Sequence, residues 1–256
     1  IDVFGPLASE LDALEQNIGR VELDWTIGHV TRLALSLSHE LPNIDNADFY
    51  AGLVSLPAFA CIRELELSGQ WLRRVDPIAA FPRETVSGLR ALTLTSDPWT
   101  AVDLADWRPL TRLERLTLKI GQPRMGPLCL PALRSLSMRM QTIESTLSPA
   151  FVAGSLEQLE QIELALGYAT GFESWVPDYA PRLRELLDAP TLTHMRRLIL
   201  RVERGELQQE FAAMLLEAPL LNRLQQLDVS ACTWSPAARS WIEQRRRTLP
   251  CQVRMG

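Results

Sequence analysis

The stretch Leu113-Glu-Arg-Leu116-Thr-Leu118 carries the pattern that decides the fold: apolar residues separated first by two positions and then by one. This pattern recurs along the chain, and an apolar residue usually lies three positions before each unit. The eight units occupy residues 30–35, 62–67, 89–94, 113–118, 133–138, 159–164, 195–200 and 224–229. Their mean spacing is about 28 residues, a period typical of architectures built from stacked repeats.

The spacing within a unit predicts a short strand. Leu116 and Leu118 alternate with Thr117, so both leucines face one side of the strand and the threonine faces the other. One unit cannot bury its apolar side alone, but stacked neighbours share a continuous core. We therefore expect an α/β fold with parallel strands side by side on an inner wall and irregular helices and loops on the other side.

In these units, over residues 30–229, the chain resembles the leucine-rich-repeat superfamily. The resemblance implies a horseshoe-shaped solenoid with its strands on the concave face. The family places Asn or Cys at the ninth repeat position, which this chain fills only with Cys232, so we expect less regular loops. Residues 5–30 are also similar to bacterial leucine-rich-repeat proteins that carry a small repeat-companion domain upstream.

The units divide the chain into three predicted parts. Residues 1–29 form an N-terminal cap of one helix and one strand, 30–234 form the solenoid, and 235–256 form a C-terminal cap. In that cap, Ser235 and Pro236 begin a helix, and 252–254 add a last strand.

The connecting segments between units are predicted to differ. Residues 179–187 and 207–218 are expected to be helices on the convex side. Residues 96–100 and 121–127 are too rich in proline and glycine for a helix and are expected to be loops or short turns.

The composition limits the possible functions. Of 256 residues, 46% are hydrophobic, which excludes a disordered chain, and the net charge of -5 gives no bulk attraction for nucleic acid or an anionic membrane. The four cysteines are isolated in the sequence, which favours reduced thiols in a cytoplasmic protein. Lys119 is the only lysine, typical of a GC-rich bacterial genome. The chain begins with isoleucine, so an upstream leader or domain remains possible.

The sequence holds no recognisable catalytic constellation. It contains no G-x-S-x-G, no phosphate-binding glycine loop, no H-E-x-x-H and no G-x-G-x-x-G. We therefore expect no catalytic residues, cofactor, metal or small-molecule substrate, and we expect that the protein is not an enzyme.

The inner wall carries the candidate binding residues. Between and beside the strand leucines, its charged positions are Glu64, Glu66, Arg115, Lys119, Arg139, Arg197 and Arg201. They predict an inner wall that is acidic at its start, at Glu64 and Glu66, and basic in its middle. Arg197 and Arg201 form a second basic row further along the chain. Three aromatic residues are candidates at the loop edge: Trp71, Tyr168 and Trp175. The plain alternative is a solvated face without a dedicated partner, since exposed strand positions are polar in any case.

Three functions are compatible with these sequence features. The first is a non-catalytic scaffold that recognises another protein or a peptide through the concave sheet and its loops. The second is the targeting or sensor subunit of a bacterial enzyme or defence assembly, with catalysis on another domain or chain. The third is nucleic-acid binding through the basic rows, which the net charge disfavours.

Overall fold

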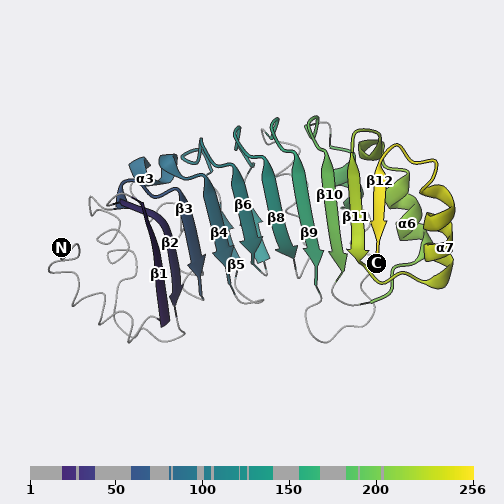
Figure 1. The fold of residues 1–256 in the computed structure, drawn as a ribbon, viewed down its shortest axis with the longest axis horizontal. Helices are drawn as coiled ribbons and strands as arrows, with labels where there is room; N and C mark the ends of the chain where they lie inside the picture. Colours follow the sequence, from purple (N-terminus) through teal and green to yellow (C-terminus); the bar gives the residue numbers. More distant parts are fainter. Residues whose placement is uncertain are drawn as a thin grey trace.

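The computed structural model describes residues 19–26, 29–37, 59–69, 81, 83–96, 101–104, 107–120, 122–125, 127–140, 156–167, 183–189, 191–202 and 205–256. Its main feature is one open sheet of ten strands (Figure 1). In spatial order these are β1 (Gly19–Thr26), β2 (His29–Leu37), β3 (Glu64–Ser68), β4 (Ala91–Thr95), β6 (Arg115–Lys119), β8 (Ser135–Met140), β9 (Gln161–Leu166), β10 (Arg197–Val202), β11 (Gln226–Ala231) and β12 (Gln252–Met255). β1 is antiparallel to β2, and all the other pairs are parallel.

The strand register stacks the repeat leucines in rows. Leu65 pairs with Leu92, which pairs with Leu116, and the same row continues into the later strands. Leu67, Leu94 and Leu118 form a second row two residues further along the strands. These leucines are buried, and the residues between them are not. Each fully buried leucine contributes about 1.5–3 kcal/mol of transfer free energy, so the rows form the core that the sequence predicts.

Backbone hydrogen bonds explain why each unit has the same internal spacing. The N–H of Leu113 donates to the carbonyl of Leu110, three residues earlier, and this turn places both side chains in the core. The N–H groups of Glu114 and Arg115 then both donate to the carbonyl of Arg90 in the preceding unit. The same fork recurs at six successive junctions, from the one between β3 and β4 to the one between β10 and β11. The repeat in the sequence is therefore a repeat of backbone geometry.

The connectors between strands include short helices and a second, small sheet. Short α3 (Arg83–Gly88) precedes β4, residues 183–187 are helical, and α6 (Gln209–Leu216) and η4 (Pro219–Asn222) precede β11. The two helices expected on the convex side are thus present within the predicted ranges, although residues 179–182 lie outside the described part of the chain.

One connector differs from the prediction. Residues 121–127 were expected to be a loop or a turn, yet they contain β7 (Gln122–Met125), which pairs in parallel with β5 (Ala101–Leu104). The two connectors lie side by side, so each provides the backbone hydrogen-bond partner that the other needs to form a strand. The sequence of one connector alone does not predict this strand. Pro123 is tolerated because a two-stranded sheet leaves one side of each strand unpaired.

The C-terminal end follows the sequence prediction closely. α7 (Pro236–Arg245) begins after Ser235, whose hydroxyl accepts a hydrogen bond from the N–H of Ala238 at 3.2 Å. α7 and α6 lie together at this end of the sheet (Figure 1). Partly buried Trp234 packs on the core with its ring centroid 6.2 Å from that of Phe211. β12 then pairs with β11 as the last strand.

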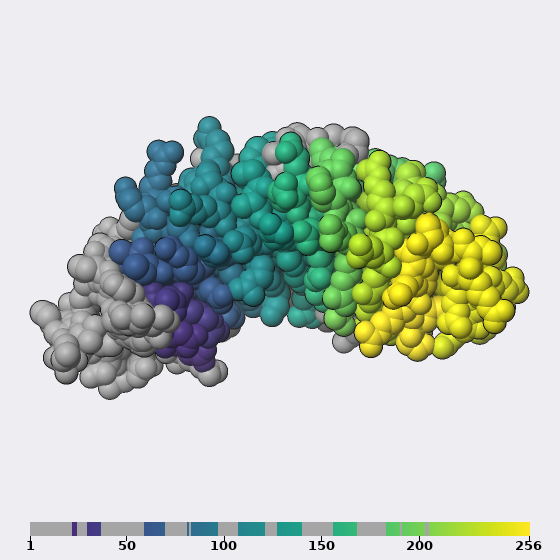
Figure 2. Space-filling view, turned by 45° about the horizontal axis from the view of Figure 1, so that its top comes forward, coloured from purple at the N-terminus to yellow at the C-terminus, as the bar shows by residue number. Residues whose placement is uncertain are grey.

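The molecule is elongated and bent, and its segments follow one another in sequence order from end to end (Figure 2). Each unit therefore packs mainly against its sequence neighbours. The structure is an α/β protein with one large, mostly parallel, open sheet, and with a two-stranded sheet and short helices in its described connectors, an arrangement compatible with a solenoid.

Candidate functional site

One side of the sheet carries the leucine rows and is buried, and the other side carries mostly polar side chains. We call this second side the polar face; it consists of the strand residues that alternate with the leucines in β2 to β12, together with Glu22 and Asp24 of β1. All seven charged residues singled out from the sequence lie on this face, distributed over β3, β6, β8 and β10. The strand register therefore brings them onto one continuous surface.

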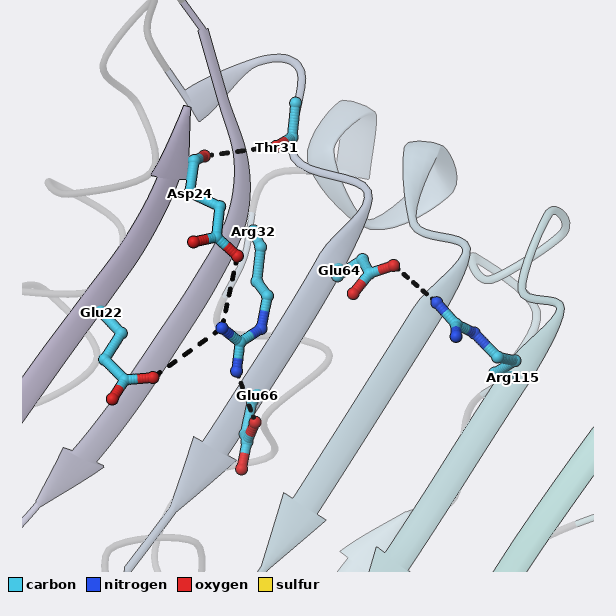
Figure 3. A network of polar contacts seen from close by, with 7 residues as sticks. All are labelled: Glu22, Asp24, Thr31, Arg32, Glu64, Glu66 and Arg115. Atoms are coloured by element: carbon cyan, nitrogen blue, oxygen red, sulfur yellow. Dashed lines mark hydrogen bonds and ion pairs between the residues drawn. The ribbon is translucent and has the colours of Figure 1, made fainter. Parts of the chain in front are cut away.

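Glu64 and Arg115 form an ion pair that spans three strands. The register places Ala91 of β4 directly between Glu64 of β3 and Arg115 of β6. The alanine side chain is too small to separate them, and Nη2 of Arg115 lies 2.5 Å from Oε1 of Glu64 (Figure 3). The acidic start and the basic middle of the face are thus joined by a direct contact that the sequence did not predict.

Arg32 of β2 lies among three carboxylates. Its guanidinium is 3.3 Å from Asp24, 3.3 Å from Glu66 and 3.8 Å from Glu22 (Figure 3). The hydrogen bond to Asp24 is the main cause of the raised pKa of Arg32, which burial lowers, and Glu66 raises it further. Three carboxylates around one arginine leave this end of the face acidic.

Arg32 and two of these carboxylates line a hollow of about 280 Å³ on the polar face. Its walls include Glu22, Arg32 and Glu66, with the hydroxyl residues Ser36 and Ser68. Glu22 and Asp24 were not chosen from the sequence. The alternation of Val21, Leu23 and Trp25 was the signal that could have placed both carboxylates on this side of β1.

The basic row predicted around β10 is largely neutralised by neighbouring carboxylates. Nε of Arg201 lies 2.5 Å from Oε1 of Glu163, and this hydrogen bond is the main cause of the raised pKa of Arg201. Arg197 and Arg254 lie 3.9 and 3.8 Å from Asp228.

Asp228 is a buried member of this group. Burial raises its pKa, but hydrogen bonds from the hydroxyl and N–H of Ser230, assisted by Arg254 and Arg197, bring it below the ordinary value. Ile199 alternates with Leu198 and Leu200 and so occupies a position of the polar face, yet it is only 6% exposed. Its register partners, Glu163 and Asp228, form ion pairs with the long side chains of Arg201 and Arg197.

The middle of the face differs from both ends. We define the central patch as the nine polar-face residues of three adjacent strands, β4, β6 and β8: Ala91, Thr93, Thr95, Arg115, Thr117, Lys119, Ser135, Ser137 and Arg139. It holds three exposed basic side chains and five hydroxyls, and none of its nine residues is acidic. Lys119 and Arg139 are direct register partners, so two positive charges lie side by side.

A second set of charge pairs runs along the edge where the strands begin. Arg90 lies 3.3 Å from Glu114, and Arg134 lies 2.9 Å from Glu160. These residues all follow the first apolar residue of their units, and their alternation of arginine and glutamate was the signal in the sequence. Each such exposed ion pair contributes about 0–1 kcal/mol to the free energy of unfolding. The pairs therefore align neighbouring units more than they stabilise the fold.

The remaining predictions concern the aromatic residues and other ligands. Trp71, Tyr168 and Trp175 lie outside the described residues, so their placement at a loop edge remains a prediction. Among the described residues, no group of three histidine, cysteine or acidic side chains is arranged to hold a metal ion. In the same part of the chain, no helix combines the length and apolarity required to cross a membrane.

Comparisons with known proteins inform the fold alone. No protein-family model matches the sequence, and no curated protein matches it. The structure is similar to the crystal structure of a Bacteroides fragilis protein from the Northeast Structural Genomics Consortium, with a TM-score of 0.51 and 14% sequence identity. The alignment covers 97% of this chain and 82% of that one, so the likeness in fold extends over nearly the whole chain.

Proposed function

We propose that the chain is a leucine-rich-repeat solenoid, that the polar face is its concave face, and that it binds a protein or peptide partner without catalysing a reaction. The repeated turn and the forked hydrogen bonds at six junctions support the repeat class, because they give successive units one backbone geometry. The leucine rows supply the shared core that such a solenoid needs.

One observation carries the proposed binding function. The polar face extends over nine parallel strands and presents charged and hydroxyl side chains, while the leucines of the same strands are buried on the opposite side. Charge complementarity across such a surface gives a partner its register and speeds its association. A rigid backbone also lowers the entropy cost of ordering the surface on binding.

A capture experiment tests this function. The tagged protein is compared with the double variant Lys119→Glu/Arg139→Glu, and bound proteins from the native host are quantified by mass spectrometry. The matched control is Arg112→Glu/Arg223→Glu, which makes the same charge change at exposed positions in the turns before β6 and β11. Neither control arginine makes an ion pair with the residues that the structure describes.

We expect at least one specific partner to be lost from the Lys119/Arg139 variant and kept by the control. Circular dichroism verifies that both variants are folded. If the two variants retain the same set of proteins as the wild type, the polar face is not the binding surface and the proposal is wrong.

A further inference from the structure

The outer edge of β12, the side of this strand turned away from β11, has no strand beside it among the described residues (Figure 1). The N–H of Gln252 donates to the carbonyl of the residue before β11. Alternate residues of a strand in a parallel sheet turn their backbone groups to opposite neighbours, so Gln252 and Arg254 turn theirs to β11. Val253 and Met255 therefore turn their N–H and C=O groups outward, where no backbone group in the described part of the chain pairs with them.

Apolar side chains at the same edge are incompletely covered. The register places Val253 beside Leu227 and Met255 beside Val229. Leu227 and Val229 are 0% and 1% exposed, whereas Val253 and Met255 pack on the core but are only partly buried. A further strand with apolar residues in the same register would cover these two side chains, as β12 covers those of β11.

The features that usually protect a sheet edge do not protect this one. Such edges often carry a proline or a charged side chain that opposes pairing with another chain. β12 contains no proline, and its one charged residue is Arg254. The guanidinium of Arg254 lies 3.8 Å from Asp228 of β11, so it is directed back over the polar face and not across the outer edge. Arg239 of α7 donates a hydrogen bond of 2.6 Å to the carbonyl of Gly256, which fixes the end of the strand.

We infer that the outer edge of β12 binds an extended segment of another protein, which joins the sheet as a further strand and places apolar residues at alternate positions against Val253 and Met255. Unpaired backbone groups and partly covered apolar side chains on one strand carry this inference. Main-chain hydrogen bonds supply the affinity in such binding, and the alternate side chains supply the selectivity. The edge is distinct from the polar face, so the inference goes beyond the proposed function.

A second copy of the chain is the competing occupant. It fits the edge less well, because it brings its own α6 and α7 to the same end of the sheet, where these helices already lie (Figure 1). A single extended segment brings no such bulk. Its pairing with the outer edge is also favoured by the fixed position of β12, since a preformed edge lowers the entropy cost of binding.

Synthetic peptides test the alternation and the backbone pairing. Labelled peptides of about six residues, the usual length of a strand, alternate valine with threonine, and fluorescence anisotropy measures their binding. A peptide with the valines and threonines in separate blocks is the control and should bind about tenfold or more weakly. Two further peptides are N-methylated on the valines alone or on the threonines alone. One of the two should bind about tenfold or more weakly than the parent and the other within about twofold, because only alternate N–H groups face β12.

Amide exchange and one substitution test the protein side. In the free wild type, measured by NMR, the N–H groups of Val253 and Met255 should exchange faster than that of Arg254, and the alternating peptide should protect them. Val253→Pro removes an outward N–H and leaves the hydrogen bonds to β11 in place. It should lower peptide affinity about tenfold or more, whereas Arg254→Gln should change it less than about twofold. Circular dichroism verifies that both variants are folded, and the exchange measurement needs no variant.

Several results would overturn the inference. They are slow exchange of the Val253 and Met255 amides in the free protein, no binding of the alternating peptide, equal binding of the block peptide, or equal effects of the two methylations. Sedimentation that shows a dimer abolished by Val253→Pro would assign the edge to a second copy instead. Failure here is distinguishable from failure of the proposed function, because Lys119→Glu/Arg139→Glu should leave peptide binding unchanged. If that variant loses its captured partner while no peptide binds the wild type, only the inference about the edge is wrong.

Discussion

The guanidinium of Arg115 and the carboxylate of Glu64 meet at 2.5 Å although β4 lies between their strands. The contact is possible because Ala91 occupies the register position between them. Both side chains stay largely in solvent, with 61% of Arg115 and 45% of Glu64 exposed. The pair therefore orients Arg115 on the polar face but adds little to stability.

A double-mutant cycle tests that conclusion. We expect the coupling between Glu64→Gln and Arg115→Gln in the free energy of unfolding to be below about 1 kcal/mol, because water screens an exposed pair. Urea unfolding of the four proteins measures it. A coupling of about 2 kcal/mol or more would mean that the pair is a structural clamp.

Leu116 tests the shared core. It is 1% exposed and stacks between Leu92 and Leu136 in one row. Leu116→Ala should lower the free energy of unfolding by about 2–5 kcal/mol, since it removes buried contacts from two interfaces between units. Thr117→Ala, one residue away on the polar face, should change it by less than about 0.5 kcal/mol. Similar urea midpoints for both variants would contradict the alternation of buried and open faces.

Asp228 is expected to make stability depend on pH. Its pKa is lower in the folded protein than in the unfolded chain, so its contribution is present above the unfolded value of about 3.9 and is lost as pH falls through the folded value. Asp228→Asn should therefore be less stable than the wild type at pH 7 by about 1–3 kcal/mol, since a charged hydrogen-bond acceptor is lost. The difference should shrink in acid. A difference that stays constant down to pH 3 would contradict this role of the carboxylate.

The cysteines are expected to differ in reactivity. Burial raises the pKa of Cys232 to about 12, and burial also raises the pKa of Cys251, so little thiolate forms at pH 8 at either residue. Cys129 is exposed. In alkylation with iodoacetamide at pH 8, followed by mass spectrometry, Cys129 should be modified well before Cys232 and Cys251. Equal rates for Cys129 and Cys232 would show that the environment assigned to Cys232 is wrong.

The fold was predictable where the signal is local to a unit. The spacing in residues 113–118 contains both the turn that buries Leu113 and the alternation that buries Leu116, so the strands and their buried face follow from the pattern. The helix cap at Ser235 was predictable for the same reason. The pairing of β5 with β7 was not, because each strand forms only when a neighbouring connector lies beside it.

The candidate site was predictable as a set of residues but not as a distribution of charge. The alternation places Arg115, Lys119 and Arg201 on one face, as the structure has them. It cannot show that Arg201 is neutralised by Glu163, because that contact depends on side-chain reach across strands. The alternation likewise cannot show that Ile199 is buried, because its burial also depends on side chains from the neighbouring strands. Only the three-dimensional register shows which of these charged side chains meet in ion pairs.

Site-specific photo-crosslinking tests the central claim most directly. A photo-reactive amino acid is placed at Thr117, in the middle of the central patch, or at Glu157, an exposed residue in the turn before β9. With the captured partner present, the account predicts a covalent adduct from position 117 and none from position 157. An adduct from position 157 together with none from position 117 would contradict the claim that the polar face is the binding surface.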